Sequence, residues 1–290
     1  MEDMTSTTGH AKPFLAIIAL TLITSCQNSV RNISLPRATK HVSSLVEVAK
    51  GDVAEVRAGM PTGSQLLEPL YRSSTAPKDD LEKVRATLTR ARERVQDLRV
   101  AKSTFFALVD VDGTILRSDR VPDVMAGKNL WSAVPAAAQV TQGKVTSVSG
   151  SLAEASGVKG RVDAQWFWLV PVTVDAKVRG AYVTGWSWSA YAYRLETALR
   201  NDLKTTARNE QSKEPLTYVY LDVAGAVYGA PVSPEVNASA IRKAVTLERV
   251  TNDQVWSTVI EITGREYALA VKRAPDLGDN VAIAVLRSET

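Results

Sequence analysis

A short pattern that occurs twice in the 290-residue chain constrains its fold more than any other feature. Residues 105–116 and 217–228 each contain an apolar run rich in β-branched and aromatic side chains, then an Asp, a Gly and a second apolar run. Two such runs around a short turn are typical of a β-hairpin, in which Gly113 and Gly225 would supply the positive φ that the turn needs. The repeat therefore predicts two related domains in tandem.

The first copy also allows a catalytic interpretation. Asp110-Val111-Asp112-Gly113-Thr114 resembles the first motif of the haloacid dehalogenase-type phosphatases, in which one Asp is the nucleophile and the second is the general acid/base. The second copy has Ala224 where the second carboxylate would be, so the two copies share a turn and not a carboxylate pair. Such phosphatases also need a parallel sheet with helical crossovers, whereas residues 144–187 read as successive strands. We therefore favour the hairpin, and the phosphatase that uses Asp110 and Asp112 is an alternative.

Composition excludes several classes of protein. The chain is 45% hydrophobic and 23% charged, which is typical of a globular protein with room for two domains. Its net charge of +4 comes from scattered residues without a basic block, so we expect no nucleic-acid partner. The single cysteine, Cys26, excludes an internal disulfide. The two histidines, His10 and His41, lie near the N-terminus, so we expect neither a His/Cys metal centre, nor a catalytic triad, nor any cofactor.

The N-terminus indicates export. Residues 14–23 form an apolar run that is too short for a membrane span and has the length of a signal-peptide core. The run leads into Ile23-Thr24-Ser25-Cys26, which resembles the bacterial lipobox, whose Cys is lipidated and becomes the mature N-terminus. This resemblance implies a lipoprotein signal peptide over residues 1–25 and attachment to the membrane through a lipid on Cys26. An unlipidated signal peptide or a buried strand is the other interpretation.

The residue after the lipobox bears on location. Gln27 is not the acidic residue that retains lipoproteins in the inner membrane of enteric bacteria. The resemblance therefore favours an outer-membrane lipoprotein that faces the periplasm, with exposure at the cell surface as an alternative.

Two helices are expected before the first hairpin. Residues 26–78 would hold a polar tether over 27–40 and a first helix. The apolar residues of this helix recur at helical spacing from Val42 to Met60, and Pro61 and Gly63 would end the helix. Asp79 would cap a second helix, in which apolar residues spaced by three and four form a seam from Leu81 to Leu98. The seam could form a homodimer, but it is short for a coiled coil, so we favour packing within the chain.

The rest of the chain repeats one plan. We expect a first and larger domain within residues 79–211, where the hairpin is followed by a mixed segment over 119–143, strands near 145–152, 164–174 and 178–188, and a helix over 189–210. A second and smaller domain over 212–290 has a hairpin over 216–229, a helix near 234–246 and strands near 255–262, 266–273 and 280–287.

This plan resembles that of PAS-like domains, and two copies behind a long helix resemble the extracytoplasmic double Cache sensor modules. The residues that carry the likeness are 108–118, 127–130, 142–143, 169–172 and 179–183. The resemblance implies an α+β fold of two tandem PAS/Cache-like domains with antiparallel sheets, preceded by a long N-terminal helical segment. Such modules usually lie between two membrane spans and feed a cytoplasmic kinase or chemotaxis domain. No second long apolar run follows here, so we expect a signal to pass to a partner protein.

The same resemblance implies a ligand in the first domain, between the sheet and residues 119–143. A second argument, independent of the resemblance, uses the alternation of side chains between the two faces of each strand. If the two neighbouring strands pair so that these faces coincide, five aromatic side chains form one surface, an aromatic wall: Trp166, Trp168, Tyr182, Trp186 and Trp188. An aromatic wall suits a small-molecule pocket, but it could equally pack beneath a helix. The groups expected opposite this wall are Arg120, Asp123, Trp131, Arg161 and Asp163, where an arginine would suit a carboxylate ligand.

From the sequence we therefore expect a lipid-anchored, non-enzymatic periplasmic protein that binds a small molecule or relays a signal through a partner. The alternative is a structural or interaction lipoprotein of an envelope complex.

Overall fold

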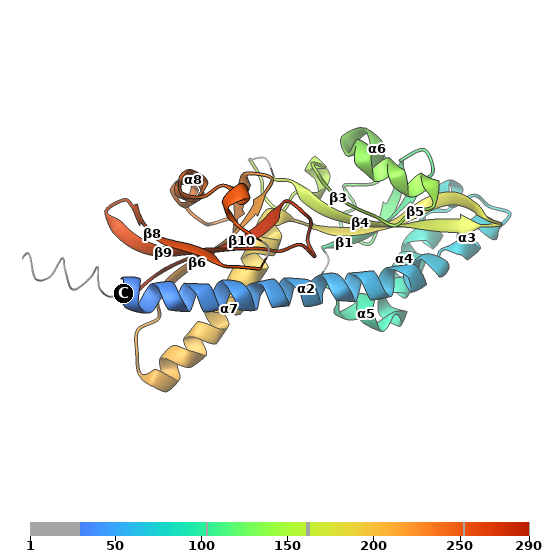
Figure 1. Cartoon of the computed structure of the whole chain (residues 1–290). Coiled ribbons are helices and arrows are strands. Elements are labelled where there is room, and N and C mark those ends of the chain that lie inside the picture. The colour runs from blue at the N-terminus through green and yellow to red at the C-terminus, as the bar shows by residue number, and fades with distance from the viewer. Residues whose placement is uncertain (1–29, 103, 161–162, 252, 290) are drawn as a thin grey trace, which may run out of the picture.

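One long helix runs along two consecutive sheets and connects the whole molecule (Figure 1). The computed structural model describes residues 30–102, 104–160, 163–251 and 253–289, so the predicted signal peptide and Cys26 lie outside the described residues. Helix α2 (Leu35–Gln65) has 31 residues, which corresponds to a length of about 46 Å. It follows a short π-helical turn, η1 (Val30–Ser34), and contacts strands of both sheets. Among the described residues, no helix combines the length and the apolar character needed to cross a membrane.

The bounds of α2 differ from those expected. Helix α2 begins at Leu35, within the predicted tether, because Pro36 lies in its first turn, where its missing N–H costs no hydrogen bond. It also continues through Pro61. Gly63 and Ser64 beyond this proline are buried, and the Ser64 hydroxyl donates a 2.7 Å hydrogen bond to the carbonyl of Pro171. These tertiary contacts hold the last turn of the helix against the first sheet.

The two sheets have the same strand order. The first sheet is arranged β2-β1-β5-β4-β3 and the second β7-β6-β10-β9-β8, with every neighbouring pair antiparallel. The strands of the first are β1 (Phe105–Asp110), β2 (Ile115–Ser118), β3 (Thr146–Gly150), β4 (Gln165–Val174) and β5 (Lys177–Ser187). Those of the second are β6 (Leu216–Val223), β7 (Ala226–Gly229), β8 (Trp256–Ile262), β9 (Arg265–Arg273) and β10 (Val281–Ser288). The predicted tandem of antiparallel domains is confirmed.

The Asp carboxylates of the two hairpin turns accept hydrogen bonds from backbone N–H groups of the same turn. Gly113 and Gly225 have φ values of 93° and 86°, in the left-handed region that the pattern predicted. Asp112 accepts a 2.8 Å hydrogen bond from the Thr114 backbone N–H, and Asp222 accepts one of the same length from that of Gly225. Strand β1 lies antiparallel to both of its neighbours, so the parallel sheet that the phosphatase interpretation requires is absent from the described residues.

Short helices complete the first domain. They are α3 (Glu68–Arg72), η2 (Pro77–Asp79), α4 (Leu81–Arg94), α5 (Gln96–Val100), α6 (Leu130–Ala133), η3 (Pro135–Gln142) and η4 (Ala153–Ala155). The cap of α4 is Asp80 rather than the predicted Asp79, because the Asp80 carboxylate accepts the Lys83 N–H. The predicted seam is split into two helices at Val95, which has extended backbone angles. Apart from the half-buried Leu81, its apolar residues are buried within the chain.

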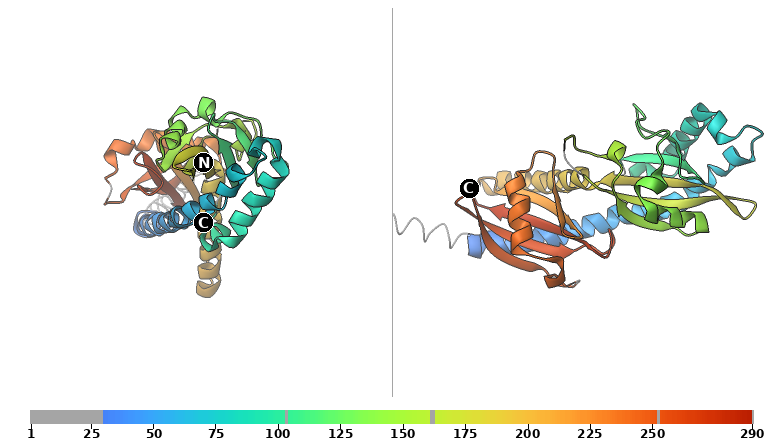
Figure 2. Two further views of the ribbon diagram at one scale, coloured as in Figure 1. Left: turned by 90° about the vertical axis from the view of Figure 1, so that its right-hand side faces the viewer. Right: turned by 90° about the horizontal axis from the view of Figure 1, so that it is seen from above.

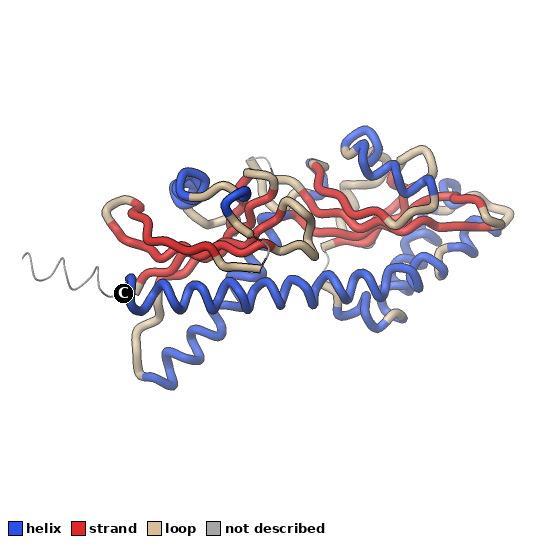
Figure 3. The backbone as a smooth tube through the Cα atoms, in the orientation of Figure 1, coloured by secondary structure: helices blue, strands red, loops and turns tan. Residues whose placement is uncertain are grey.

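The helices form layers on opposite faces of the sheets. Helix α2 lies along one face of both sheets, while α6 and α8 (Glu235–Ala244) lie on the other face of the first and second sheet respectively (Figure 3). Helix α7 (Trp188–Glu210) follows β5 directly, packs against β6 and β7, and projects from the body with its last turns (Figure 2). The short helix η5 (Leu247–Arg249) precedes β8.

Candidate functional site

The predicted aromatic wall exists. Trp166 pairs with Trp186, Trp168 with Thr184, and Val170 with Tyr182, so the faces of β4 and β5 combine as the alternation suggested. The rings of Trp166 and Trp186 stack with centroids 4.2 Å apart. Trp188 was predicted to lie on the strand, but it is the first residue of α7. The Ser187 side chain caps this helix by accepting a hydrogen bond from the Ala190 N–H.

The wall does not face the 119–143 segment, so this part of the prediction is wrong. Trp166, Tyr182, Trp186 and Trp188 are 0% exposed and belong to the core that α2 and α7 cover. The segment covers the opposite face of the sheet, where Phe105, Phe167, Leu169 and other apolar residues are also fully buried. Period-two alternation shows which side chains share a face, but not which helix covers that face. These four side chains of the wall are therefore part of a packed core, whereas Trp168 is half-buried, with the Arg57 guanidinium 5.3 Å from its ring centroid.

Asp123 and Arg120 follow β2 on the segment that covers this opposite face. The Asp123 carboxylate accepts hydrogen bonds from the Ser118 N–H (2.8 Å), the Ser118 hydroxyl (2.7 Å) and the Ala126 N–H (3.3 Å). Guanidinium nitrogens of Arg85 and Arg117 each lie 4.0 Å from it. Asp123 thus holds the chain after β2 in place, whereas the Arg120 side chain makes no hydrogen bond or ion pair with any residue that the structure describes.

Trp131 and Asp163 also have structural partners. The Trp131 indole N–H donates to the carbonyl of Val111 (3.2 Å), and its ring covers the turn at Gly113. Asp163 is 3% exposed and accepts the N–H groups of Gly157 (2.9 Å) and Ser189 (3.2 Å), which ties a loop of the first domain to the first turn of α7. Arg161 lies outside the described residues. Of the predicted groups that the structure describes, Arg120, Asp123, Trp131 and Asp163, none therefore forms a binding site at the aromatic wall.

The sequence analysis missed a buried polar cluster between α2 and α7. The Asp52 carboxylate accepts a 2.9 Å hydrogen bond from the Tyr191 hydroxyl and pairs with Arg194. Burial raises the pKa of Asp52, and the Arg194 guanidinium opposes this rise. The sequence did contain a signal for this cluster, because Asp52 places a carboxylate on the apolar face of the first helix, beside Val53 and Val56. Asp52 lies on α2, whereas Tyr191 and Arg194 lie on α7, so the cluster links the two long helices.

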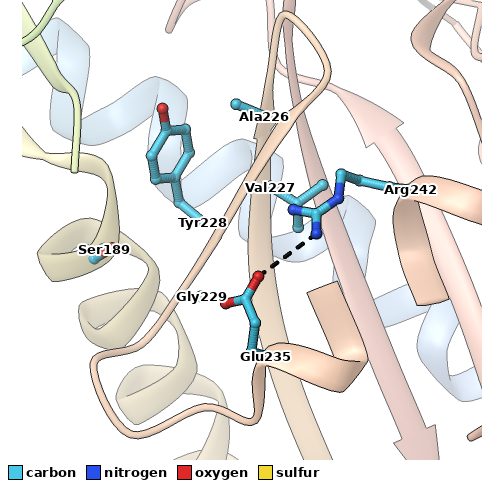
Figure 4. A pocket seen from close by; sticks show the side chains of 7 residues that line it. All are labelled: Ser189, Ala226, Val227, Tyr228, Gly229, Glu235 and Arg242. Atoms are coloured by element: carbon cyan, nitrogen blue, oxygen red, sulfur yellow. Dashed lines mark ion pairs between the residues drawn. The ribbon is translucent and has the colours of Figure 1, made fainter. Parts of the chain in front are cut away.

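A pocket of about 320 Å³ lies where α7 meets the second sheet (Figure 4). It is lined by Ser189 of α7, by Ala226, Val227, Tyr228 and Gly229 of β7, and by Glu235 and Arg242 of α8. The Arg242 guanidinium lies 3.5 Å from the Glu235 carboxylate, and both side chains are well exposed. Burial raises the pKa of the Tyr228 hydroxyl, and the charge of Asp163 in the first domain adds to this rise. The pocket therefore lies at the junction of the two domains.

None of these residues was a predicted site residue. A Gly at the end of β7 and a Glu and an Arg seven residues apart on a helix are common features, and only the tertiary structure brings them beside α7. In the described ranges, no group of three or more His, Cys, Asp or Glu side chains is placed to hold a metal ion.

Comparison with solved structures identifies the fold. A domain of a protein assigned to the sensory box/GGDEF family of Vibrio parahaemolyticus has a TM-score of 0.56 and 13% identity, with 91% of this chain and 98% of that chain covered. The ligand-binding domain of the Campylobacter jejuni chemoreceptor Tlp3, in complex with L-norvaline, has a TM-score of 0.51 and 11% identity over 88% of this chain and 92% of that chain. The chain has a tandem Cache/PAS-like fold. No family model and no curated protein matches its sequence.

The ligand-binding domain of Mlp24, solved with asparagine, shows the same tandem Cache/PAS-like fold, with a TM-score of 0.51 and 13% identity over 91% of this chain and 95% of that one. At such identities the likeness concerns the fold alone. In the present chain, the pocket beside α7 is lined by this helix and the second domain, and not by residues between the first sheet and its 119–143 segment.

Proposed function

We propose that this protein is an extracytoplasmic ligand-binding module of the sensor type, held at the membrane by a lipid on Cys26 and coupled to a partner protein. The observation that supports this proposal best is the repeated strand order of two sheets along one helix, in a chain whose overall fold is similar to that of sensor domains. The pocket between the domains offers a place for a small molecule.

The position of α2 suits such an anchor. Cys26 precedes Val30 by four residues, a stretch of chain that spans at most about 14 Å. Helix α2 begins beside the second domain and ends at the first, so an anchored molecule would carry its first domain about 46 Å further from the anchored end. This distance would leave the first domain accessible to a partner. Outer-membrane attachment on the periplasmic side is the location that the lipobox-like sequence favours.

Labelling with a fatty-acid analogue in the native host tests the anchor. We expect the wild type to take up the label and to sediment with membranes, and Cys26→Ser to lose both properties. Ser25→Ala keeps a small residue before the cysteine and serves as the control. An unlabelled wild-type protein would contradict the lipid anchor but not the binding function.

Thermal denaturation against a broad panel of metabolites tests the binding function. A ligand that binds only the folded protein raises the melting temperature as its concentration exceeds the dissociation constant. No shift with any member of the panel would contradict a ligand-binding role.

A structural or interaction lipoprotein is the second candidate. The observation that favours it is that both faces of the first sheet are packed with fully buried side chains. Co-purification of one stable protein partner with the lipidated chain, together with no shift by any metabolite, would favour this candidate.

The proposal includes no catalytic step. Asp112 is engaged in capping its turn, and Asp110 accepts a 2.9 Å hydrogen bond from the Val111 N–H. We expect no magnesium-dependent hydrolysis of a generic phosphate ester. Hydrolysis that is lost in Asp110→Asn would contradict this part of the proposal.

A further inference from the structure

The charged side chains at the start of α2 are all basic. Residues 27–46 contain Arg31, Arg37 and Lys40 and no Asp or Glu. These three side chains are exposed, and none of them forms a hydrogen bond or an ion pair with any residue that the structure describes. Over residues 47–65, the rest of the helix, acidic residues outnumber basic ones: Glu47, Asp52 and Glu55 against Lys50 and Arg57. The basic character is therefore confined to one end of α2.

This placement of the basic residues does not help the helix itself. The N-terminal end of a helix carries a partial positive charge, so acidic side chains are favoured there and basic ones are not. The first turn of α2 contains no acidic residue, and Arg37 is its third residue. A departure from such a local preference is expected where a surface serves a function.

Carboxylates close to this end of α2 do not neutralise it. The Glu289 carboxylate accepts a 3.0 Å hydrogen bond from the buried Arg287 and is thus engaged within the fold. Burial lowers the pKa of His41, and three cations lower this pKa further: Arg287, Lys40 and Arg37. The Asp202 carboxylate of α7 opposes them without outweighing them. The start of α2 therefore lies in a region of positive potential.

The basic end of α2 is also the end that the proposed anchor would hold. Figure 1 shows the start of α2 beside the C-terminus, at the opposite end of the molecule from the first domain. The chain from Cys26 to Val30 spans at most about 14 Å, which is less than two Debye lengths of about 8 Å at physiological ionic strength. The headgroups of the anchoring membrane would thus lie within the range of these charges.

We propose that Arg31, Arg37 and Lys40 bind the phosphate groups of anionic phospholipids and hold the start of α2 on the membrane surface. This inference rests on the proposed lipid anchor and adds the surface of the folded chain that orients the anchored protein. A lipid on one cysteine leaves the attached body free to tilt, whereas basic residues at one end of a helix attract that end to the headgroups. The first domain is then held about 46 Å further from the membrane.

The accessibility of two lysines of α2 tests the inference. Lys40 belongs to the basic end, whereas Lys50 is an exposed lysine about 15 Å further along the same helix. The protein purified from the native host is reconstituted in vesicles of phosphatidylcholine, with or without phosphatidylglycerol, and amines are acetylated briefly and quantified by mass spectrometry. We expect phosphatidylglycerol to slow the acetylation of Lys40 several-fold and to leave that of Lys50 unchanged. High salt should remove this protection, because it screens the charges.

A double variant tests the surface itself. Arg31→Gln with Arg37→Gln should lose most of the protection of Lys40, since each basic residue near an anionic surface strengthens binding by about fivefold. Arg90→Gln with Arg94→Gln is the matched control, because it removes the same charge from two exposed arginines of α4. The control should keep the full protection. The melting temperature in detergent shows that each variant is folded.

Three outcomes would overturn the inference. The first is acetylation of Lys40 at the same rate in both kinds of vesicle, and the second is equal protection of Lys40 and Lys50, which would mean that α2 lies flat. The third is protection of Lys40 in intact cells but not in anionic vesicles, which would assign the basic end to an acidic protein.

A failure of the anchor can be told apart from a failure of the basic surface. If the native protein carries no lipid, it is mixed with the same vesicles and sedimented. We then expect more protein to sediment with phosphatidylglycerol vesicles than with phosphatidylcholine vesicles, and the double variant to lose this preference. An unlipidated protein without such a preference would contradict both the anchor and the basic surface.

Discussion

The hydroxyl of Tyr191 donates a 2.9 Å hydrogen bond to the carboxylate of Asp52, and this contact joins α7 to α2. The Tyr191 ring stacks on Trp186 with centroids 4.4 Å apart, and Trp186 stacks in turn on Trp166. The aromatic wall of the first domain therefore continues into the helix that carries one side of the interdomain pocket. Its role is to fix the position of α7 relative to the first sheet.

Tyr191→Phe tests this link. The variant keeps the stacked ring but removes the hydrogen bond to a buried carboxylate, so we expect the free energy of unfolding to fall by about 1–3 kcal/mol. Tyr193→Phe, two residues further on α7, changes a side chain that is 53% exposed and should alter stability by less than about 0.5 kcal/mol. Urea denaturation measures both. Equal stability of the two variants would show that the Asp52 contact contributes nothing.

Two glycines of α2 should respond to alanine in opposite directions. A Cβ on Gly63 would lie 2.6 Å from Cε1 of Tyr182 and 2.8 Å from Cδ1 of Leu98, so Gly63→Ala should destabilise the protein by about 1–3 kcal/mol. A Cβ on the exposed Gly51 would meet no atom within 4 Å, so Gly51→Ala should stabilise it by about 0.5–1 kcal/mol by restricting the unfolded chain. Thermal denaturation of the two variants checks the difference in sign.

His41 should make stability depend on pH. Burial, and then the Arg287 guanidinium 3.0 Å from its Nε2, lower the pKa of His41 to about 4, with Lys40 and Arg37 acting in the same direction and Asp202 opposing them. The folded protein therefore binds the proton less readily than the unfolded chain. This contribution to stability is complete above about pH 6.5 and is lost as the pH falls toward 4.

Because His41 is partly exposed, solvent screening should limit this loss to about 1–2 kcal/mol. His41→Gln does not titrate in this range, so its stability should change less between pH 6.5 and 4 than that of the wild type. Parallel denaturation curves at several pH values measure the difference. An identical pH dependence of the two proteins would show that His41 is not the group responsible.

Asp123 and Arg120, both expected at a ligand site, should differ in their effect on stability. Asp123→Ala leaves three hydrogen-bond donors without their acceptor, two of them on the backbone, and should cost about 2–4 kcal/mol. Arg120→Ala should change stability by less than about 0.5 kcal/mol. Chemical denaturation of both variants tests this. A neutral Asp123→Ala would contradict the structural role of this carboxylate.

Much of the fold could be predicted because it depends on local signals. The turns at Gly113 and Gly225 need a positive φ, and the alternation along β4 and β5 is visible in the order of Trp166, Trp168 and their neighbours. The bounds of α2 could not be predicted, because Pro61 is a helix breaker by itself. Its effect is outweighed by tertiary contacts such as that of Ser64 with Pro171 of β4, which lies more than a hundred residues away.

The sequence by itself determined the tandem of antiparallel sheets and the set of side chains on each strand face, because these follow from the backbone period of two and from the conformational freedom of glycine. Only the tertiary structure decided that α2 and α7 bury the aromatic wall, and that the 119–143 segment covers the opposite face. It also decided that Arg242 and Glu235 line one pocket together with Ser189 at the domain junction. The physical reason is that both faces of each sheet are apolar, so which helix packs on which face depends on contacts between residues far apart in the chain.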